Sequence, residues 1–181
     1  MADNHRQKGL SAVTVMGLAA IVTLGVLIVN PIIQAARPPT PGSHCLSNVK
    51  QLDLAVLLYS NDNDDRMPIA GVWYDAARPY AHASGMPTID FRCPAVPETF
   101  NGAPSVGYAF NELLSIRVPK ETDDQARTIS VYESANLLKN ATDPVSSLPF
   151  HGRHDGRNTF GYWDGHAKAH MWSENPGLVR P

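Results

Sequence analysis

The first feature of the hydrophobic pattern is an uninterrupted apolar run close to the N-terminus. Residues 10–29 contain neither a charged residue nor a proline. As a helix with a rise of 1.5 Å per residue, this run spans about 30 Å, the thickness of the hydrocarbon core of a bilayer. The run is apolar on every face, whereas a buried helix of a soluble protein usually has a polar side. We therefore predict a transmembrane helix over residues 10–36, embedded through residues 10–33.

The charges before this run indicate its orientation. His5, Arg6 and Lys8 precede it, and Asp3 is the only acidic residue there. Basic residues favour the cytoplasmic side of a membrane. We expect residues 1–9 to be a cytoplasmic leader and the residues after about 35 to be extracytoplasmic, in a single-pass protein of the cytoplasmic (inner) membrane.

A proline-rich segment and a second helical pattern follow. Residues 37–42 read RPPTPG, and prolines remove backbone donors, so we expect a linker over residues 37–43. From Ser43, which can cap a helix, apolar residues recur at helical spacing; they are Cys45, Val49, Leu52, Val56 and Tyr59. Between them lie Asn48, Lys50, Gln51 and Asp53, which we expect to face away from the core. The pattern predicts an amphipathic helix that ends in the segment SNDNDD.

The remaining chain favours strands. Residues 128–133, 158–164 and 166–172 are rich in β-branched or aromatic residues or alternate in polarity. Shorter strands are predicted at 71–74 and 90–93, within an otherwise irregular segment. The fold class that follows is α+β. Residues 44–181 would form one domain, with the amphipathic helix packed on a small antiparallel sheet that ends in a β-hairpin.

The dipeptide Asp164-Gly165 predicts the turn of that hairpin. This pair readily adopts a two-residue type I′ loop, which would pair Trp163 with His166 across the two strands. Phe160 and Tyr162 would then lie on the core face. Trp163 would lie on the outward face, and it is the residue that we expect to contact a partner.

Composition narrows the range of functions. The chain of 181 residues has a formal net charge of −2 and no basic cluster beyond the leader, so we exclude nucleic-acid binding. Cys45 and Cys93 both lie on the extracytoplasmic side, where disulfides persist, so we expect one bridge between them. Two buried free thiols are the alternative. The pair forms no CxxC motif and has no zinc-ligand spacing, which disfavours a redox or zinc role.

The histidines raise the question of a metal site or an acid–base pair. Four of the seven histidines fall between His151 and His170. His166 and His170 would stand about 13 Å apart on a strand, too far to share an ion. The segment HGRH followed by Asp155 offers chelating groups, but its flanking glycines are typical of a turn.

Other motifs of catalysis and cofactor binding are missing. The acidic segment at residues 60–65 lacks the glycine and the bidentate glutamate of a calcium loop. The chain contains no GxSxG, HExxH, Walker or dinucleotide-binding motif. We therefore expect no enzyme activity, no catalytic residue, no metal and no cofactor.

Several segments together resemble a known family. His154 is followed by nine residues and then by Asp164-Gly165. This spacing is similar to the C-terminal H-X9-DG motif of prepilin-type proteins. The segments CLSNVKQLDLAVLLYSNDNDDRMP, FRCPA, SVGYAFNELL and TISVYESA also resemble that family, so the similarity covers most of residues 45–170.

The resemblance implies how the chain is processed and what it binds. A prepilin peptidase would cut between Gly9 and Leu10, and Leu10 would become a methylated N-terminus. Pro31 would become position 22 of the mature chain, where pilins often carry a proline. The expected partners are other pilin-like subunits, the membrane assembly machinery and the peptidase. Thr14 stands where the family usually has a glutamate, which favours a minor subunit of a type IV pilus-like or type II secretion system.

Two alternatives have different consequences. The chain could be a single-pass protein whose outer domain binds a ligand and has no filament role. It could also be an exported enzyme or metal-binding protein that signal peptidase cuts near the small residues Ala35 and Ala36. A run of twenty apolar residues is long for a signal peptide, which disfavours the second alternative.

Overall fold

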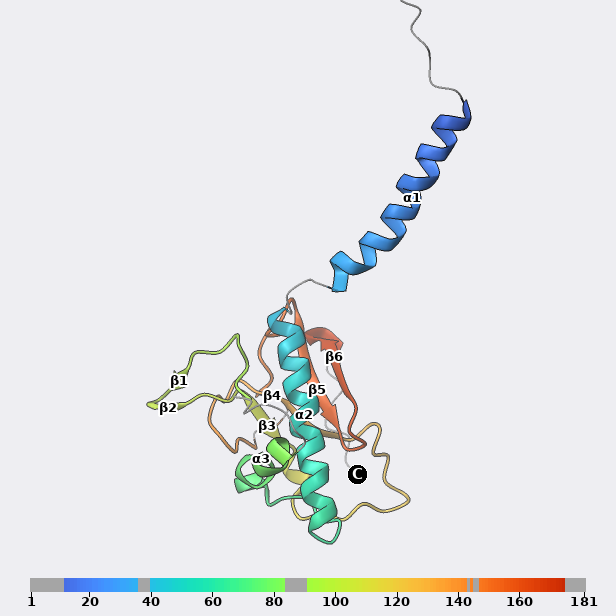
Figure 1. The fold of residues 1–181 in the computed structure, drawn as a ribbon. Helices are drawn as coiled ribbons and strands as arrows, with labels where there is room; N and C mark the ends of the chain where they lie inside the picture. Colours follow the sequence, from blue (N-terminus) through green and yellow to red (C-terminus); the bar gives the residue numbers. More distant parts are fainter. Residues whose placement is uncertain (1–11, 36–39, 84–90, 143, 145–146, 175–181) are drawn as a thin grey trace, which may run out of the picture. The chain divides into compact units, whose positions relative to one another are not determined.

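The computed structural model describes residues 12–35, 40–83, 91–142, 144 and 147–174. It has an α+β fold, as predicted, and two compact units, residues 1–39 and residues 40–181 (Figure 1). Among the described residues, the first unit contains one α-helix. The described part of the second unit contains two α-helices, a four-stranded antiparallel sheet and a small two-stranded ribbon.

The helix of the first unit is α1, Ala12–Ala35. Its residues Ala12–Ile33 form a stretch of 22 residues that is long and apolar enough to cross a membrane, and none of it is buried. Pro31 lies inside the helix, and its missing N–H costs one intrahelical hydrogen bond. The expectation of an apolar N-terminal helix is confirmed, while Gly9, Leu10 and Ala36 lie outside the described residues.

Helix α2, Pro41–Asp62, begins earlier than the sequence predicted. The N-cap is Thr40, not Ser43: the Thr40 hydroxyl accepts a hydrogen bond from the Ser43 backbone N–H at 3.2 Å. The predicted linker over residues 37–43 is therefore too long at its C-terminal end. Pro41 does not break the helix, because at the first helical position its missing N–H would have no intrahelical partner in any case.

The buried face of α2 is wider than predicted. Asn48 and Asp53, which we expected to face solvent, are 7% and 0% exposed. Val49, Leu52 and Val56 are fully buried, as their spacing indicates. Asp53 follows Val49 by one helical turn, so it lies on the same face, and polarity alone was a wrong guide to its position.

The segment after α2 is helical where the sequence predicted a strand. A 3-10 turn, Ala70–Val72, leads directly into helix α3, Trp73–Ala83, so the strand predicted at residues 71–74 is wrong. Trp73 is fully buried. Residues 91–93 form no strand either, and Asp90 lies outside the described residues.

The main sheet has the strand order β3-β4-β5-β6, and every neighbouring pair is antiparallel. Its strands are β3 (Tyr108–Phe110), β4 (Ile129–Glu133), β5 (Arg157–Tyr162) and β6 (Ala167–Met171). The last three were predicted from sequence, and β3 was not. Strands β1 (Thr99–Phe100) and β2 (Ala103–Pro104) form the separate ribbon, and short 3-10 turns occur at Glu112–Leu114 and Trp172–Glu174.

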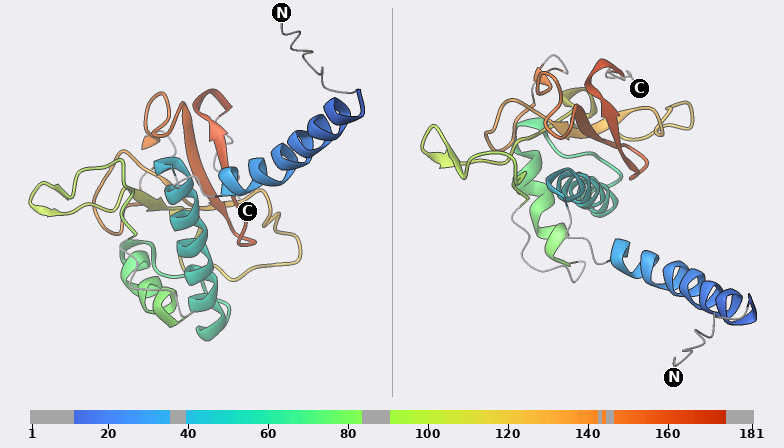
Figure 2. Two further views of the ribbon diagram at one scale, coloured as in Figure 1. Left: turned by 45° about the horizontal axis from the view of Figure 1, so that its top comes forward. Right: turned by 90° about the horizontal axis from the view of Figure 1, so that it is seen from above.

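Helix α2 packs against strands β4, β5 and β6 and against α3, which lies beside it in the view along the axis of α2 (Figure 2). The contact with β5 is close at Gly161, where a Cβ atom would lie 3.1 Å from both Asp53 Cγ and Val49 Cγ1. The main core lies at this interface. Phe160 and Tyr162, which we expected on the core face, are both buried, but they belong to a second, smaller cluster with Ile129 and Tyr132 and not to the main core.

The hairpin between β5 and β6 differs from the prediction by one residue. Gly161 pairs with Ala167 and Thr159 with Ala169, so the predicted register is wrong. The Tyr162 N–H donates to the His166 carbonyl at 2.9 Å, which leaves three loop residues, Trp163, Asp164 and Gly165. Gly165 has a φ of +88°, typical of the last position of a three-residue hairpin loop.

Candidate functional site

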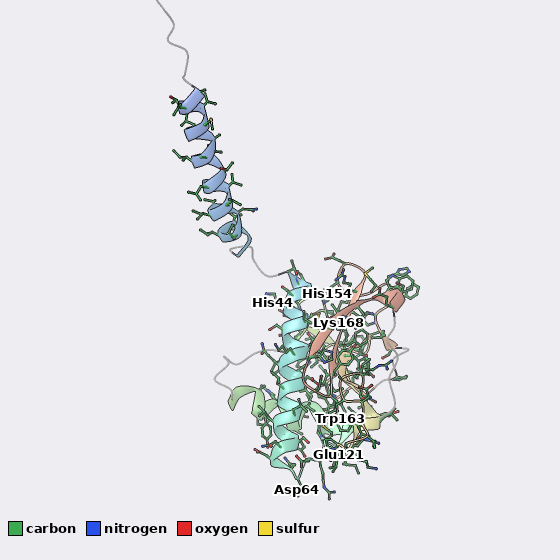
Figure 3. All side chains as sticks on the ribbon, turned by 90° about the vertical axis from the view of Figure 1, so that its right-hand side faces the viewer. His44, Asp64, Glu121, His154, Trp163 and Lys168 are labelled. Carbon is green, nitrogen blue, oxygen red and sulfur yellow. A yellow bond between two sulfur atoms is a disulfide. The ribbon has the colours of Figure 1, made fainter. Side chains whose placement is uncertain are left out.

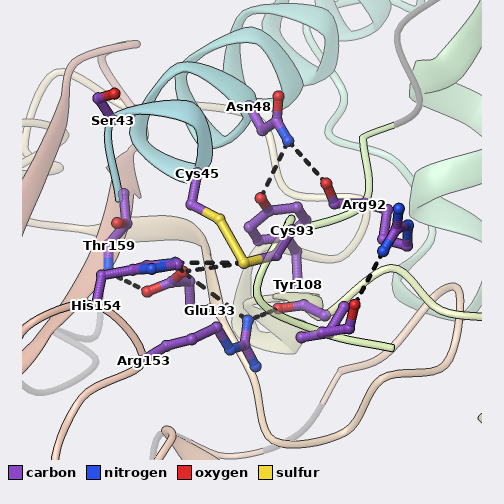
Figure 4. Close-up of a disulfide and its surroundings, with 12 residues drawn as sticks. Ser43, Cys45, Asn48, Arg92, Cys93, Tyr108, Glu133, Arg153, His154 and Thr159 are labelled. Carbon is purple, nitrogen blue, oxygen red and sulfur yellow. Dashed lines mark hydrogen bonds and ion pairs between the residues drawn. A yellow bond between two sulfur atoms is a disulfide. The ribbon is translucent and has the colours of Figure 1, made fainter. Parts of the chain in front are cut away.

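The candidate site is a buried cluster around the disulfide between Cys45 and Cys93 (Figure 4). Cys45 comes from the first turns of α2, and Cys93 from the loop before β1. The two Cα atoms are 5.4 Å apart, a usual separation for a disulfide, and both residues are 0% exposed. The predicted bridge is therefore present, and among the described residues no cysteine is free.

Glu133, the last residue of β4, lies beside the disulfide and is also 0% exposed. Its Oε2 atom accepts a hydrogen bond from the Thr159 N–H of β5 at 2.8 Å. Its Oε1 atom lies 3.9 Å from Cys93 Sγ. A buried carboxylate needs partners. Besides the Thr159 N–H, the partners of Glu133 are His154 and Arg153.

His154 connects the carboxylate and the sulfur. Its Nε2 atom lies 3.0 Å from Glu133 Oε1 and 3.3 Å from Cys93 Sγ. The side chain is 8% exposed. This histidine begins the H-X9-DG spacing, and its place is thus against the disulfide.

Arg153 completes the cluster. Its Nη1 atom is 3.9 Å from Glu133 Oε1 and donates to the Gly107 carbonyl at 2.8 Å, while Nη2 donates to the Ser134 carbonyl. Burial lowers the pKa of the guanidinium, and Glu133 opposes that change. The Glu133 carboxylate and the Arg153 guanidinium form a buried pair of opposite charges. Without such a partner, either buried charge would be strongly destabilising.

The opposite end of the H-X9-DG spacing has a different role. Asp164 Oδ1 accepts a hydrogen bond from the His166 N–H at 3.1 Å, and it lies 2.5 Å from His166 Nδ1. Together with Gly165 these contacts form the hairpin loop. His154 and Trp163 lie towards opposite ends of the domain (Figure 3), so the structure does not bring the two parts of the motif together.

Trp163 does not lie on the surface, which corrects the expectation that it contacts a partner. It is 0% exposed, and its backbone N–H donates to the Thr128 carbonyl at 2.9 Å. The Arg117 guanidinium lies 5.9 Å from the centre of its ring, within cation–π range. The extra loop residue moves Trp163 out of the strand pairing, and its large side chain joins the main core instead.

A shallow polar groove of about 400 Å³ lies beside the hairpin. Tyr162 stacks on His166 with ring centres 4.2 Å apart, and its hydroxyl lies 3.0 Å from His170 Nε2. Burial raises the pKa of Tyr162 and lowers that of His170. Arg127 and Lys168 also line the groove, so it has the chemistry to hold a small polar or anionic ligand.

The remaining histidine of HGRH lies apart from the cluster. His151 packs between Phe150 and Trp172, with ring centres 3.9 and 4.9 Å away. The chelating set of His151, His154 and Asp155 that the sequence offered is not assembled among the described residues. Instead, Cys45, Cys93, Glu133 and His154 have ligand atoms within 4.8 Å of one another.

Sequence reasoning missed Glu133, Arg153 and Asp53. Glu133 ends a strand of otherwise buried residues, and this is the signal that could have found it. Asp53 is fully buried; the Ser130 hydroxyl donates to its Oδ1 atom, and burial raises the pKa of its carboxyl. Its spacing from Val49 and Val56 was the available signal.

Comparison with protein-family models, with curated proteins and with solved structures finds no match for this chain.

Proposed function

We propose that this chain is a membrane-anchored structural subunit, pilin-like or pseudopilin-like, of a type II secretion or type IV pilus-like system, and that it is a minor subunit. One observation carries the proposal: α1 contains a stretch of 22 residues, Ala12–Ile33, that is long and apolar enough to cross a membrane. Such a helix needs lipid or neighbouring helices around it. The disulfide-linked α+β domain is then the exported part, on the outer face of the cytoplasmic membrane.

A groove on α1 supports contact with a neighbouring helix. It is lined by Val22, Gly25, Val26, Val29, Asn30 and Ile33. Gly25 has open space around the position of a Cβ atom, which allows a second helix to approach closely. The prepilin-type family usually has a glutamate where this chain has Thr14, and its carboxylate pairs with the amino terminus of a neighbouring subunit. Because Thr14 has no carboxylate, we infer that the chain is a minor subunit and not the bulk subunit of a filament.

Cysteine cross-linking in native membranes tests this assembly. Val26→Cys places a thiol in the groove, and Ile28→Cys places one about 160° away around the helix. The two side chains are similarly exposed, at 59% and 55%, and the native cysteines are already paired. We expect oxidation to cross-link Val26→Cys to neighbouring subunits much more efficiently than Ile28→Cys. A chain that stays monomeric in both variants would contradict assembly.

The groove beside the hairpin favours a second candidate, an anchored domain that binds a ligand and has no filament role. Its aromatic ring, histidines and cations are those of a site for a polar or anionic small molecule. In this case the leader stays uncut, and His170→Ala abolishes ligand binding while membrane attachment is unchanged. Enzyme activity is not part of either proposal.

A further inference from the structure

The cluster around the disulfide contains a complete set of zinc ligands. Zinc in proteins is bound tetrahedrally by thiolate, imidazole and carboxylate groups. Cys45, Cys93, Glu133 and His154 supply two sulfurs, one nitrogen and one oxygen. With bond lengths of about 2.0 to 2.3 Å, the ligand atoms of such a tetrahedron are separated by about 3.3 to 3.8 Å.

The separations in the oxidised protein are already close to that geometry. His154 Nε2 is 3.0 Å from Glu133 Oε1 and 3.3 Å from Cys93 Sγ, and this sulfur is 3.9 Å from the carboxylate oxygen. Cys45 Sγ lies within 4.8 Å of the other ligand atoms, so zinc binding requires this sulfur to move away from Cys93 Sγ and into the tetrahedral position. Reduction of the disulfide permits that movement.

The charges of the cluster also fit a divalent ion. In the oxidised protein, Glu133 is balanced by Arg153 at 3.9 Å. In a reduced, zinc-bound form, two thiolates and the Glu133 carboxylate would face the divalent ion and the Arg153 guanidinium, so the buried site again carries no net charge. A buried site that is neutral in both forms avoids the cost of an uncompensated charge.

The surroundings orient the ligands and leave one of them beside solvent. The Thr159 N–H holds the second oxygen of Glu133, and backbone carbonyls hold Arg153. Contacts of this kind fix the ligands of metal sites. His154 also lines an open groove of about 600 Å³ at the N-terminal end of α2, with Ser43 and Arg157, so one of the four ligand side chains borders solvent.

We propose that the reduced form of this protein binds one zinc ion through Cys45, Cys93, Glu133 and His154, and that the disulfide and the metal are alternative states of one site. A phosphine reduces the disulfide by two electrons and, with one water, becomes the phosphine oxide. The two thiols lose two protons to solvent as they bind the ion. An added disulfide such as oxidised glutathione takes the two electrons back: the two thiolates form the bridge again, two glutathione thiolates leave, and the ion is released. The proposal holds whether or not the chain assembles into a filament.

Cobalt(II) is the probe for this site, because bound thiolates give it strong near-ultraviolet charge-transfer absorption and tetrahedral geometry gives it intense visible bands. The full-length protein in detergent is reduced anaerobically with a water-soluble phosphine and titrated with the ion. We expect one cobalt per chain, displaced by zinc, and no thiolate bands with oxidised protein. Reduced, folded protein without these bands would overturn the proposal.

Variants test the two ligands that are not cysteines. His154→Gln and Glu133→Gln should each weaken cobalt binding at least about tenfold. His44→Gln, on the exposed face of the same helix turn as Cys45, should leave it unchanged. Equal affinities for His154→Gln and His44→Gln would contradict the proposal.

X-ray absorption of the zinc-loaded wild-type protein does not depend on how the variants fold. The expected coordination is two sulfurs at about 2.3 Å and two nitrogen or oxygen atoms at about 2.0 to 2.2 Å. Four sulfurs, which would require two chains, or a coordination without sulfur would rule out the assigned ligand set.

Discussion

The disulfide gives the prediction whose magnitude follows most directly from the structure. Cys45 and Cys93 are separated by 48 residues, so the bridge closes a long loop in the unfolded chain. The loss of chain entropy for a loop of this length corresponds to about 4 kcal/mol of folding stability at room temperature. With a urea dependence of about 2 kcal/mol per molar, removing the bridge should lower the unfolding midpoint by about 2 M.

The assay is urea unfolding of the full-length protein in detergent, followed by the fluorescence of the buried tryptophans Trp73 and Trp163. The variant is Cys45→Ala with Cys93→Ala, and the control is Ser47→Ala on the exposed side of α2. Phosphine-reduced wild type in the presence of a chelator should resemble the double variant. A midpoint within about 0.5 M of wild type would refute the argument, because the bridge would then contribute less than about 1 kcal/mol.

Three further perturbations test the packing around α2. Burial raises the pKa of Asp53, so its native carboxyl keeps a proton that the unfolded chain releases, and stability should fall as the pH rises above about 4, the pKa of an aspartate in the unfolded chain; Asp53→Asn should weaken this decline, and equal pH profiles would contradict the assignment. Gly161→Ala should cost about 1 to 3 kcal/mol in urea unfolding, because its Cβ would crowd Asp53 and Val49, whereas Gly71→Ala, which meets open space, should cost much less. Trp163→Ala should cost about 3 to 5 kcal/mol in the same assay if the side chain is part of the core, and a cost below about 1 kcal/mol would restore it as a contact residue.

Periodicity predicted the elements that have a strong pattern of their own. The apolar run, the amphipathic stripe of α2 and the strands β4, β5 and β6 are all present. Helix α3 was missed because its proline and small residues resemble a loop, and its burial depends on contacts with α2, such as the edge-to-face pair of Tyr59 and Tyr80. Strand β3 has only three residues, too few to show an alternation.

The candidate site was predictable only in part, for a similar reason. The disulfide was predictable because the chain has two cysteines and both are predicted to lie on the side of the membrane where disulfides persist. A metal site was not predictable, because the spacing rules for metal ligands apply to ligands on one local segment. Here the four ligand residues come from α2, the loop before β1, the end of β4 and the loop before β5. The hairpin register was also not fixed by local sequence. Local preferences allow Asp164-Gly165 to form a two-residue loop, and they equally allow Gly165 to close a three-residue loop. The burial of Trp163 in the core distinguishes them.

The most direct test of the proposed function is the intact mass and N-terminal sequence of the protein isolated from its native membrane. The account predicts a chain that begins at methylated Leu10, cut after Gly9. A chain that retains residues 1–9 would contradict prepilin processing and favour a simple anchored domain. A chain that begins near Ala36 would contradict the membrane anchor itself.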